Sequence, residues 1–196
     1  NNFTVQTYSI SGVISGGGGA TVSLTGAASA TTTADSSGNF TFSGLLNGNY
    51  TVTPTKSGST FGPASQPVTV SGGNVTGINF ASLYSISGVI TGGSGATVTL
   101  TGAANAVTTA GSGGNYSFVG LVSGDYTVTP TKTNVTFNLT SLGVTITNAN
   151  ATGVNFAAVT YSISGVITGP VGATVTLSGA ASAVTTSDAL GNFTFS

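Results

Sequence analysis

Charged residues are scarce in this chain. They make up 3% of its 196 residues, with two lysines, three aspartates and no arginine or glutamate. Nucleic acids and anionic membranes are bound through clustered Lys and Arg, so neither is an expected partner. Histidine and cysteine are absent, which excludes disulfides, thiolate metal sites and His- or Cys-based catalysis. We therefore expect a protein without enzymatic activity, metal site or cofactor.

Long apolar runs and helical periodicity are missing as well. No run of eighteen apolar residues occurs, so the sequence predicts no insertion of a helix into a membrane. No window of eleven or more residues keeps a 3.6-residue period, and Thr, Val and Gly are poor helix formers. The glycine runs Gly16–Gly19 and Gly92–Gly95 lack the helix that follows a phosphate-binding loop. They indicate hairpin loops.

What the chain does contain is an internal repeat. The segment from Tyr8 to Phe80 superimposes without a gap on the sequence 76 positions further on, and "SISGVI" recurs at 9–14, 85–90 and 162–167. A third copy begins at Tyr161 and matches through "GNFTFS" at 191–196, where the sequence given stops. The predicted domains are a closing strand of a preceding repeat at 1–7, full repeats at 8–83 and 84–160, and the first half of a third at 161–196.

Apolar and small polar residues alternate in short segments that are separated by Gly, Asn, Asp and Ser, which is typical of strands and turns. The predicted strands of the first repeat are Tyr8–Ile14, Thr21–Leu24, Ala30–Ala34, Asn39–Ser43, Tyr50–Thr55, Pro67–Val70 and Gly77–Phe80. The fold class that this spacing predicts is all-β: tandem seven-stranded antiparallel β-sandwiches, Ig-like or transthyretin-like, arranged in a rod.

The apolar positions of these strands form the predicted core. In the first repeat they are Ile10, Val22, Leu24, Phe40, Phe42, Leu45, Tyr50, Val52, Val68, Val70, Ile78 and Phe80. Their counterparts in the second repeat include Ile86, Val98, Leu100, Tyr116, Phe118 and Phe156. Only three residues, "ASL" at 81–83, separate the first core from the next tyrosine, which is too few for a flexible tether. We therefore expect stiff connections.

The order "SGVI…GATVSLTG…TTTADSSGNFTFSGLLNGNYTVTPTK" resembles bacterial carboxypeptidase-regulatory-like domains, which are transthyretin-like sandwiches related in layout to the B-type repeats of surface adhesins. In that family, a strand of GATV type precedes a pair of strands with spaced Gly and aromatic residues. The first feature corresponds here to Gly19–Leu24 and the second to Gly38–Val52. The resemblance covers both full repeats and the partial third. It implies secreted, multi-repeat surface or stalk proteins without catalysis of their own.

The few side chains that could take part in chemistry have structural interpretations. Asp35 and Asp188 occupy equivalent turns, where an Asp side chain usually hydrogen-bonds the backbone, and the second repeat has Gly111 there. Adhesin repeats often link a Lys to an Asn beside a buried acid. Lys56 and Lys132 have matched positions here, but no carboxylate is matched in both repeats. We therefore expect both lysines to be exposed at strand ends and not cross-linked.

Asparagine sequons are the one positive chemical signal. They occur at Asn2, Asn39, Asn49, Asn74, Asn115, Asn134, Asn138, Asn150 and Asn192. Asn74, Asn134 and Asn150 lie in predicted loops and are the candidate N-glycosylation sites. Glycans would keep a chain with so few charges dispersed.

The start of the chain supplies a second candidate site. "NF" at residues 2–3 matches "NF" at 79–80 and 155–156, where a repeat closes. Half a sandwich would expose an apolar face and unpaired strand edges, so we expect a longer head-to-tail assembly, either one continuous chain or subunits that donate strands. The candidate strand for an inter-repeat or inter-subunit contact consists of Asn2, Phe3, Thr4, Val5 and Gln6.

Loops that repeat along with the core favour a structural protein, because binding sites are normally built from loops that differ from their scaffold. The function expected from the sequence is therefore an extracellular or cell-surface filament of stacked β-sandwiches, with copies of itself as partners and a coat of covalent glycans. Two alternatives stay open. One is the stalk or glycan-binding region of an adhesin, and the other is a set of accessory repeats of a secreted enzyme.

Overall fold

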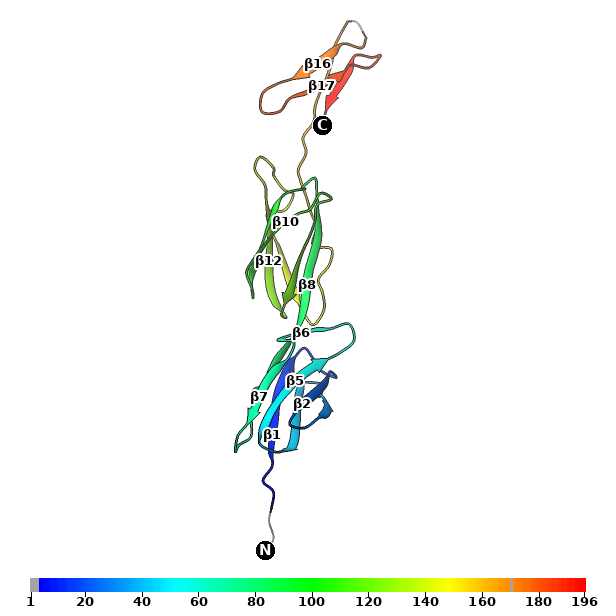
Figure 1. Cartoon of the computed structure of the whole chain (residues 1–196). Helices are drawn as coiled ribbons and strands as arrows, with labels where there is room; N and C mark the ends of the chain where they lie inside the picture. The colour runs from blue at the N-terminus through cyan, green and yellow to red at the C-terminus, as the bar shows by residue number, and fades with distance from the viewer. Residues whose placement is uncertain (1–3, 170) are drawn as a thin grey trace. The chain divides into compact units, whose positions relative to one another are not determined.

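The computed structural model describes residues 4–169 and 171–196, and the secondary structure of this part of the chain consists of eighteen β-strands with no helix. The fold is all-β, as the sequence predicts (Figure 1). The chain divides into two compact units, one ending at Ala157 and one comprising Ala158–Ser196. The first unit contains two complete β-sandwiches.

The first sandwich packs two sheets face to face. One sheet has the order β3-β2-β5-β7, formed by β2 (Thr21–Gly26), β3 (Ala30–Thr33), β5 (Gly48–Thr55) and β7 (Gln66–Val70). The other contains β4 (Asn39–Leu45), β1 (Tyr8–Ser15), the first residues of β8 (Phe80–Thr91) and β6 (Thr60–Gly62).

The second sandwich repeats this layout 76 positions on. Its first sheet has the order β10-β9-β12-β13, formed by β9 (Thr97–Gly102), β10 (Ala106–Thr109), β12 (Gly124–Thr131) and β13 (Leu142–Ile146). Its second sheet contains β11 (Asn115–Leu121), the remainder of β8 and the short β14 (Phe156–Ala157).

Strand β8 belongs to both sandwiches. Its first residues pair in parallel with β1, at Ile14↔Phe80, and antiparallel with β6, at Phe61↔Ser82. From Tyr84 onward it pairs with β11. The predicted boundary between residues 83 and 84 therefore lies inside one continuous strand, and "ASL" at 81–83 is paired β-structure (Figure 1).

The predicted core is confirmed, because alternate residues of each strand face inward. Eleven of the twelve positions expected in the first repeat are buried, and Ile78 is partly buried against them. All six expected positions of the second repeat are buried as well. The structure adds Ile14, Ala20, Ala34 and Phe61 to the first core. The outward positions of the same strands are mostly Thr, as at Thr21, which pairs with Thr33 on one side and Thr55 on the other.

The unit Ala158–Ser196 contains two two-stranded antiparallel sheets. In one, β15 (Ile163–Val166) pairs with β18 (Asn192–Phe195), and in the other, β16 (Thr174–Leu177) pairs with β17 (Ala183–Thr186). These are the counterparts of the first four strands of a full repeat. Their apolar side chains are less covered. Ile163 is 54% exposed, whereas its counterparts Ile10 and Ile86 are fully buried.

Three details of the predicted strands differ from the structure. A strand was expected over Gly77–Phe80, but only Phe80 is in a strand, and that strand continues to Thr91. The closing residues run parallel to the opening strand and not antiparallel. Strand β6 was not predicted, since its three residues are too short to show alternation.

Candidate functional site

The candidate site is the seam between the first and last segments of each repeat. We define the closing segments as residues 74–81 in the first repeat and 150–157 in the second. Each lies along one edge of an opening strand, and β4 or β11 occupies the other edge. The closing segment therefore completes the second sheet of its sandwich.

Two asparagine side chains bind each closing segment to its opening strand. In the first repeat, the backbone N–H of Ser9 donates to Asn74 Oδ1 at 2.9 Å, and that of Val13 donates to Asn79 Oδ1 at 3.1 Å. In the second repeat the N–H of Ser85 donates to Asn150 Oδ1 at 2.9 Å. These oxygens take over the role of strand carbonyls in a segment too irregular to form a full ladder.

Backbone hydrogen bonds fill the interval between the two asparagines. Val75 N–H donates to Ser9 O at 2.8 Å, and Ser11 N–H donates to Val75 O at 2.9 Å. Ile78 N–H donates to Ser11 O at 3.2 Å. The second repeat has the same set of bonds, and Asn155 Oδ1 accepts from Val89 N–H at 2.9 Å. The seam is thus a fixed pattern and not a coincidence of one repeat.

A glycine in the opening strand makes room for the closing segment. A Cβ built on Gly12 would lie 1.8 Å from the carbonyl oxygen of Ile78, and one on Gly88 would lie 1.9 Å from that of Val154. Backbone cannot move aside as a flexible side chain can, so only glycine fits. This contact explains the Gly in the first two copies of "SISGVI".

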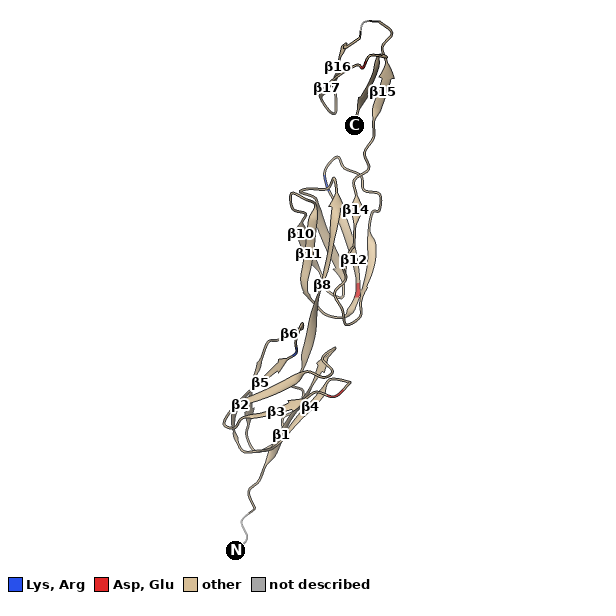
Figure 2. Cartoon of the chain, turned by 90° about the vertical axis from the view of Figure 1, so that its right-hand side faces the viewer, with Lys and Arg blue, Asp and Glu red and all other residues tan. Residues whose placement is uncertain are grey.

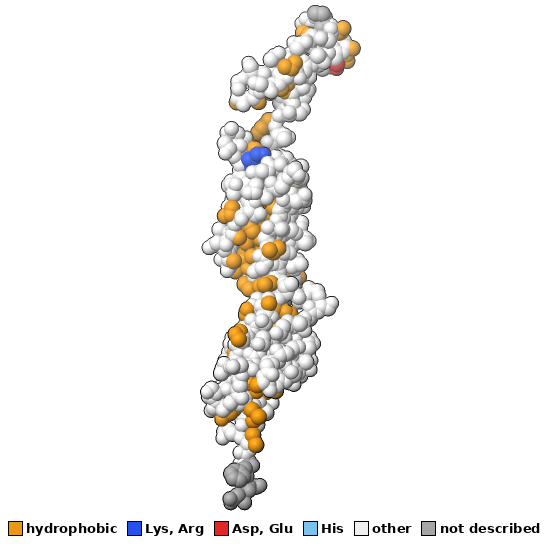
Figure 3. All heavy atoms as spheres, viewed as in Figure 1, with side chains coloured by type: hydrophobic (Ala, Val, Ile, Leu, Met, Phe, Trp, Pro, Cys, Tyr) orange, Lys and Arg blue, Asp and Glu red, His pale blue; other side chains and the backbone are white. Residues whose placement is uncertain are grey.

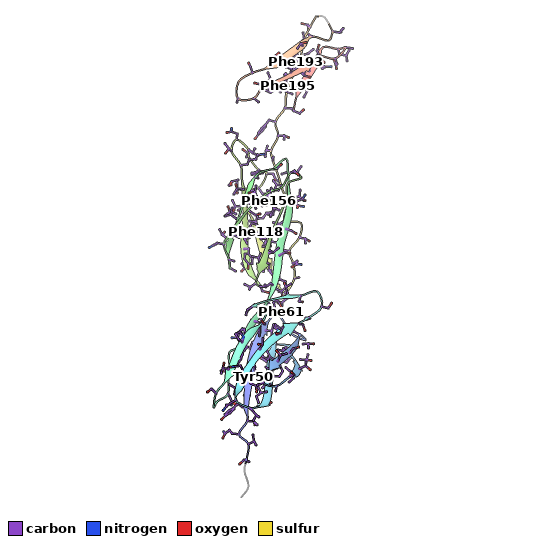
Figure 4. All side chains as sticks on the ribbon, viewed as in Figure 1. Tyr50, Phe61, Phe118, Phe156, Phe193 and Phe195 are labelled. Carbon is purple, nitrogen blue, oxygen red and sulfur yellow. The ribbon has the colours of Figure 1, made fainter. Side chains whose placement is uncertain are left out.

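Aromatic side chains anchor the end of each closing segment. Phe80 and Phe156 are both 2% exposed, and the ring of Phe80 lies 6.3 Å from that of Phe40. Phe156 and Phe118 are both labelled in the second sandwich in Figure 4. Tyr116, which replaces Phe40 there, donates its hydroxyl hydrogen to Val154 O. Burial raises the pKa of Tyr116 to about 12, so the hydroxyl stays a donor at neutral pH.

The three candidate glycosylation sites are all exposed. Asn74 and Asn150 use Oδ1 as an acceptor in the seam, which leaves Nδ2, the atom that carries an N-linked glycan, outside that bond. Asn134 lies in a tight turn between Lys132 and Val135 with a φ of 59°. By contrast, Asn39 donates from Nδ2 to Asp35 Oδ2 at 2.9 Å, so the atom that would carry a glycan already makes a structural hydrogen bond.

The candidate strand at the start of the chain is only partly described. Asn2 and Phe3 lie outside the described residues. Thr4, Val5 and Gln6 are exposed and belong to no strand, and Val5 is 73% exposed. Their assignment as an inter-repeat strand stays a prediction.

Charged side chains are isolated from one another (Figure 2). Lys56 and Lys132 are exposed, as predicted, and donate from Nζ to the carbonyl oxygens of Gly18 and Ser94 at 2.7 and 2.6 Å. Asp125 Oδ1 accepts from the hydroxyl of Thr145 at 2.6 Å. Within residues 4–169 and 171–196, no group of three or more His, Cys, Asp or Glu side chains could hold a metal ion.

The two turn aspartates act as predicted. Asp35 Oδ1 accepts from the backbone N–H of Ser37 at 2.9 Å and of Asn39 at 2.8 Å. The Asn39 side chain and these backbone donors hold the pKa of Asp35 below its ordinary value. Asp188 has the same arrangement with Asn192 and Leu190, and its pKa is also lowered.

The sequence interpretation missed the structural role of Asn74, Asn79, Asn150 and Asn155. A signal was present: the two asparagines are five positions apart in both repeats and stand before Phe, with Gly between them. Ser82 was also missed. Its hydroxyl is buried and has no hydrogen-bond partner among the described residues, and the second repeat has Ala158 at this position.

Residues 9–82 match the family model of the carboxypeptidase regulatory-like domain. The resemblance inferred from the sequence is confirmed. Residues 77–160 match the model of the second β-sandwich domain of BOS complex subunit NOMO1-like proteins. None of the curated proteins compared matches the chain. In the part of the chain that the structure describes, no helix has the length and apolar character needed to cross a membrane.

Solved structures that match the chain include two pilins and the TIE protein. A streptococcal ancillary pilin is 16% identical over 78% of this chain and 62% of its own, with a TM-score of 0.32. The TIE protein of Bacillus anthracis is 14% identical over 96% of this chain and 43% of its own, with a TM-score of 0.36. The minor pilin GBS52 of Streptococcus agalactiae is 12% identical over 79% and 97%, with a TM-score of 0.34. The chain therefore spans less than two thirds of the first two.

Proposed function

We propose that this protein is a non-catalytic structural protein, located outside the cell or on its surface, that forms a filament by head-to-tail stacking of β-sandwich repeats. The observation that carries this proposal is strand β8. It closes the first sandwich at Phe80 and opens the second at Tyr84 without a break in pairing. A repeat that ends in the first strand of its successor is suited to transmit tension along the chain. We propose the same division into domains as above: 1–7, 8–83, 84–160 and 161–196.

Strand donation between neighbours is the second part of the proposal. It is supported by exposed segments that match paired segments elsewhere in the chain. Thr4, Val5 and Gln6 follow "NF" as Ala81, Ser82 and Leu83 do, and the latter three lie in β8. Ile163 and Val166 expose 54% and 63% of their surface. Hydrophobic side chains at the surface can be followed in Figure 3.

Imaging of the purified chain by electron microscopy tests self-assembly. We expect end-to-end filaments whose length increases with protein concentration, because each added contact buries apolar surface. A variant without residues 1–7 should give shorter filaments if this segment is donated. A full-length chain that stays monomeric at every concentration would overturn the proposal.

The glycan coat is tested by mass. Peptides of these residues from the natural source should be heavier than their sequence predicts, and digestion with a peptide N-glycosidase should remove the excess. Replacement of Asn134 by Gly should remove one glycan without a loss of stability, because its side chain makes no bond in the seam and Gly readily adopts the φ of 59° found there. The same change at Asn39 should leave the mass of glycan unchanged, since its Nδ2 is bonded to Asp35. Natural peptides of bare mass at all three candidate sites would refute the coat.

A further inference from the structure

Strand β13 forms the outer edge of its sheet in the second sandwich, as β7 does in the first. Both strands belong to complete repeats. Among the described strands, each is paired along one side only, β13 with β12 and β7 with β5. An edge of this kind presents a row of free N–H and C=O groups to which another strand can be added. The two edges differ in how well they are protected against such an addition.

Proline protects the edge of β7. Pro67 has no N–H and lies opposite Thr51 of β5, so its position is one at which the backbone groups point away from the sheet. Gly143 has the matching position in β13, opposite Thr127. Since backbone groups alternate in direction along a strand, Gly143 and Thr145 direct their N–H and C=O groups to the open edge. Within the residues that the structure describes, these groups make no hydrogen bond outside the pairing with β12.

The apolar side chains of β13 are also less covered than those of β7. Val68 is 5% exposed, whereas its counterpart Val144 is only partly buried. Leu142 is partly buried as well, and it replaces Gln66, whose Nε2 donates to the carbonyl oxygen of Asn79. Strand β13 contains neither proline nor a charged residue. The second repeat therefore has an unprotected edge with apolar side chains beside it.

We propose that β13 pairs with β13 of a second copy of this chain, in antiparallel orientation, with Val144 opposite Val144. Each Gly143 then lies opposite Thr145 of the other copy and exchanges two N–H···O=C bonds with it, so that the two strands form four. On the inner face, Leu142 of one copy meets Ile146 of the other. The four-stranded sheets of two copies thereby join into one continuous sheet. The copies lie side by side and not end to end, so the pairing goes beyond the proposed head-to-tail stacking.

A second β13 fits this edge because the arrangement is self-complementary. Each outward N–H faces a C=O of the other copy, so the partial charges of the peptide groups are complementary. Gly143 leaves room on the outer face for Thr145 of the other copy, since a Cβ built on Gly143 meets no atom within 4 Å. Charged side chains on an edge strand normally prevent such pairing, and β13 has none. The two-fold symmetry places apolar residues opposite apolar residues on the inner face.

Sedimentation velocity and hydrogen exchange on the intact chain test the pairing together. We expect a dimer whose fraction increases with protein concentration, and protection of the Gly143 and Thr145 amides that increases in parallel. The amide of Thr69 provides a comparison within the same molecule, because it points to the open edge of β7 beside Pro67. It should exchange rapidly at every concentration.

Replacement of Gly143 by Pro gives β13 the residue that protects β7. The change removes one N–H from each copy, and so two of the four bonds, and it should weaken the dimer by about tenfold or more. The first repeat accommodates Pro67 at the same register, and Gly143 has free space around its missing Cβ. The variant should therefore fold, which circular dichroism checks. The matched control is Gly143→Ala, which adds a side chain but keeps the N–H and should pair as the parent does.

Absence of concentration-dependent protection at Gly143 and Thr145 would overturn the inference, and so would a Gly143→Pro variant that pairs as tightly as the parent. The exchange measurement on the parent decides the question even if the proline variant does not fold. Filaments that form while these two amides stay unprotected would defeat only this inference. Side-by-side pairs that never extend end to end would defeat the proposed filament and leave the pairing.

Discussion

Gly12 illustrates how much of this fold depends on a single missing side chain. Its Cα hydrogens face the carbonyl of Ile78, and the seam closes only because nothing larger stands there. Other glycines have no such neighbour. Gly73 has open space around its missing Cβ, although it is only one residue away from Asn74. The two positions therefore form a matched pair.

Replacement of Gly12 by Ala should lower the free energy of unfolding of the first sandwich by about 3 kcal/mol, because backbone has to move to relieve the overlap. Gly73→Ala should leave it unchanged or raise it slightly, since Ala restricts the unfolded chain. Urea unfolding, followed by aromatic fluorescence, measures both. Equal midpoints for the two variants would show that the seam does not close as described.

Asp35 gives its turn in the first repeat a dependence on pH that the matching turn of the second repeat, with Gly111, lacks. Because hydrogen bonds lower its pKa in the folded chain from the ordinary 3.8, the folded state favours the ionised carboxylate. Its contribution to stability is present above about pH 3.8 and is lost as the pH falls through the folded value. The matching loop of the second repeat keeps the same backbone hydrogen bonds with Gly111. The carboxylate therefore adds to the stability of the loop but is not required to form it.

An acid titration followed by NMR checks this assignment. The amide signals of Ser37 and Asn39 should shift together with a midpoint below 3.8, whereas those of Gly111 and Asn115 should not follow this titration. In parallel, the gap in urea midpoint between the parent and Asp35→Asn should narrow as the pH falls from 6 to 2, because protonation removes the advantage of the ionised carboxylate in the folded chain. A gap that is constant with pH would contradict the role of the carboxylate.

At the scale of the strand, alternation of apolar residues was sufficient to predict most of this fold. It located the strands now assigned β1 to β5 and β7 and nearly all of the core, because the pleat maps alternate residues onto opposite faces. It could not locate β6, which is three residues long, or show that Ala81, Ser82 and Leu83 continue a strand. Those three residues pair with a segment that is remote in sequence, and local pattern carries no such information.

The seam shows the same limit for the candidate site. Sequence identity alone predicted that repeats close at Phe3, Phe80 and Phe156. The bonds from Asn74 and Asn79 to Ser9 and Val13 join residues about 65 positions apart. Their significance depends on parallel pairing, which alternation does not distinguish from antiparallel.

Continuity of β8 predicts slow hydrogen exchange at the junction. The amides of residues 81–83 should be protected to the same order as those of residues 86–89, because both stretches are paired on the edges of one strand. The exposed loop glycine Gly73 provides the comparison, and its amide should exchange rapidly. Exchange at 81–83 as fast as at Gly73 would indicate a flexible tether in place of a shared strand.

At the scale of the molecule, the repeats form a series in which each sandwich needs segments from both halves of its own sequence. Strands β1 to β4 supply one half of the core, and β5, β7 and the closing segment supply the other. In Ala158–Ser196 the first half stands alone, and Tyr161, Ile163 and Val166 are exposed by 81%, 54% and 63%. Such a surface should bind hydrophobic dyes.

Completion of the third repeat by grafting should remove that surface. Residues 120–157, appended after Ser196, continue the register in which Phe195 matches Phe118, and they supply counterparts of β12, β13 and the closing segment. We expect the fluorescence of bound dye to fall and the urea m-value to rise, because a third core is buried only in the folded state. A graft of the same length with Asn150→Ala, Asn155→Ala and Phe156→Ala loses the seam. This variant should retain most of the dye binding. If it buried the third core as well as the parent graft does, stacking of the sheets alone, and not the asparagine seam, would close each repeat.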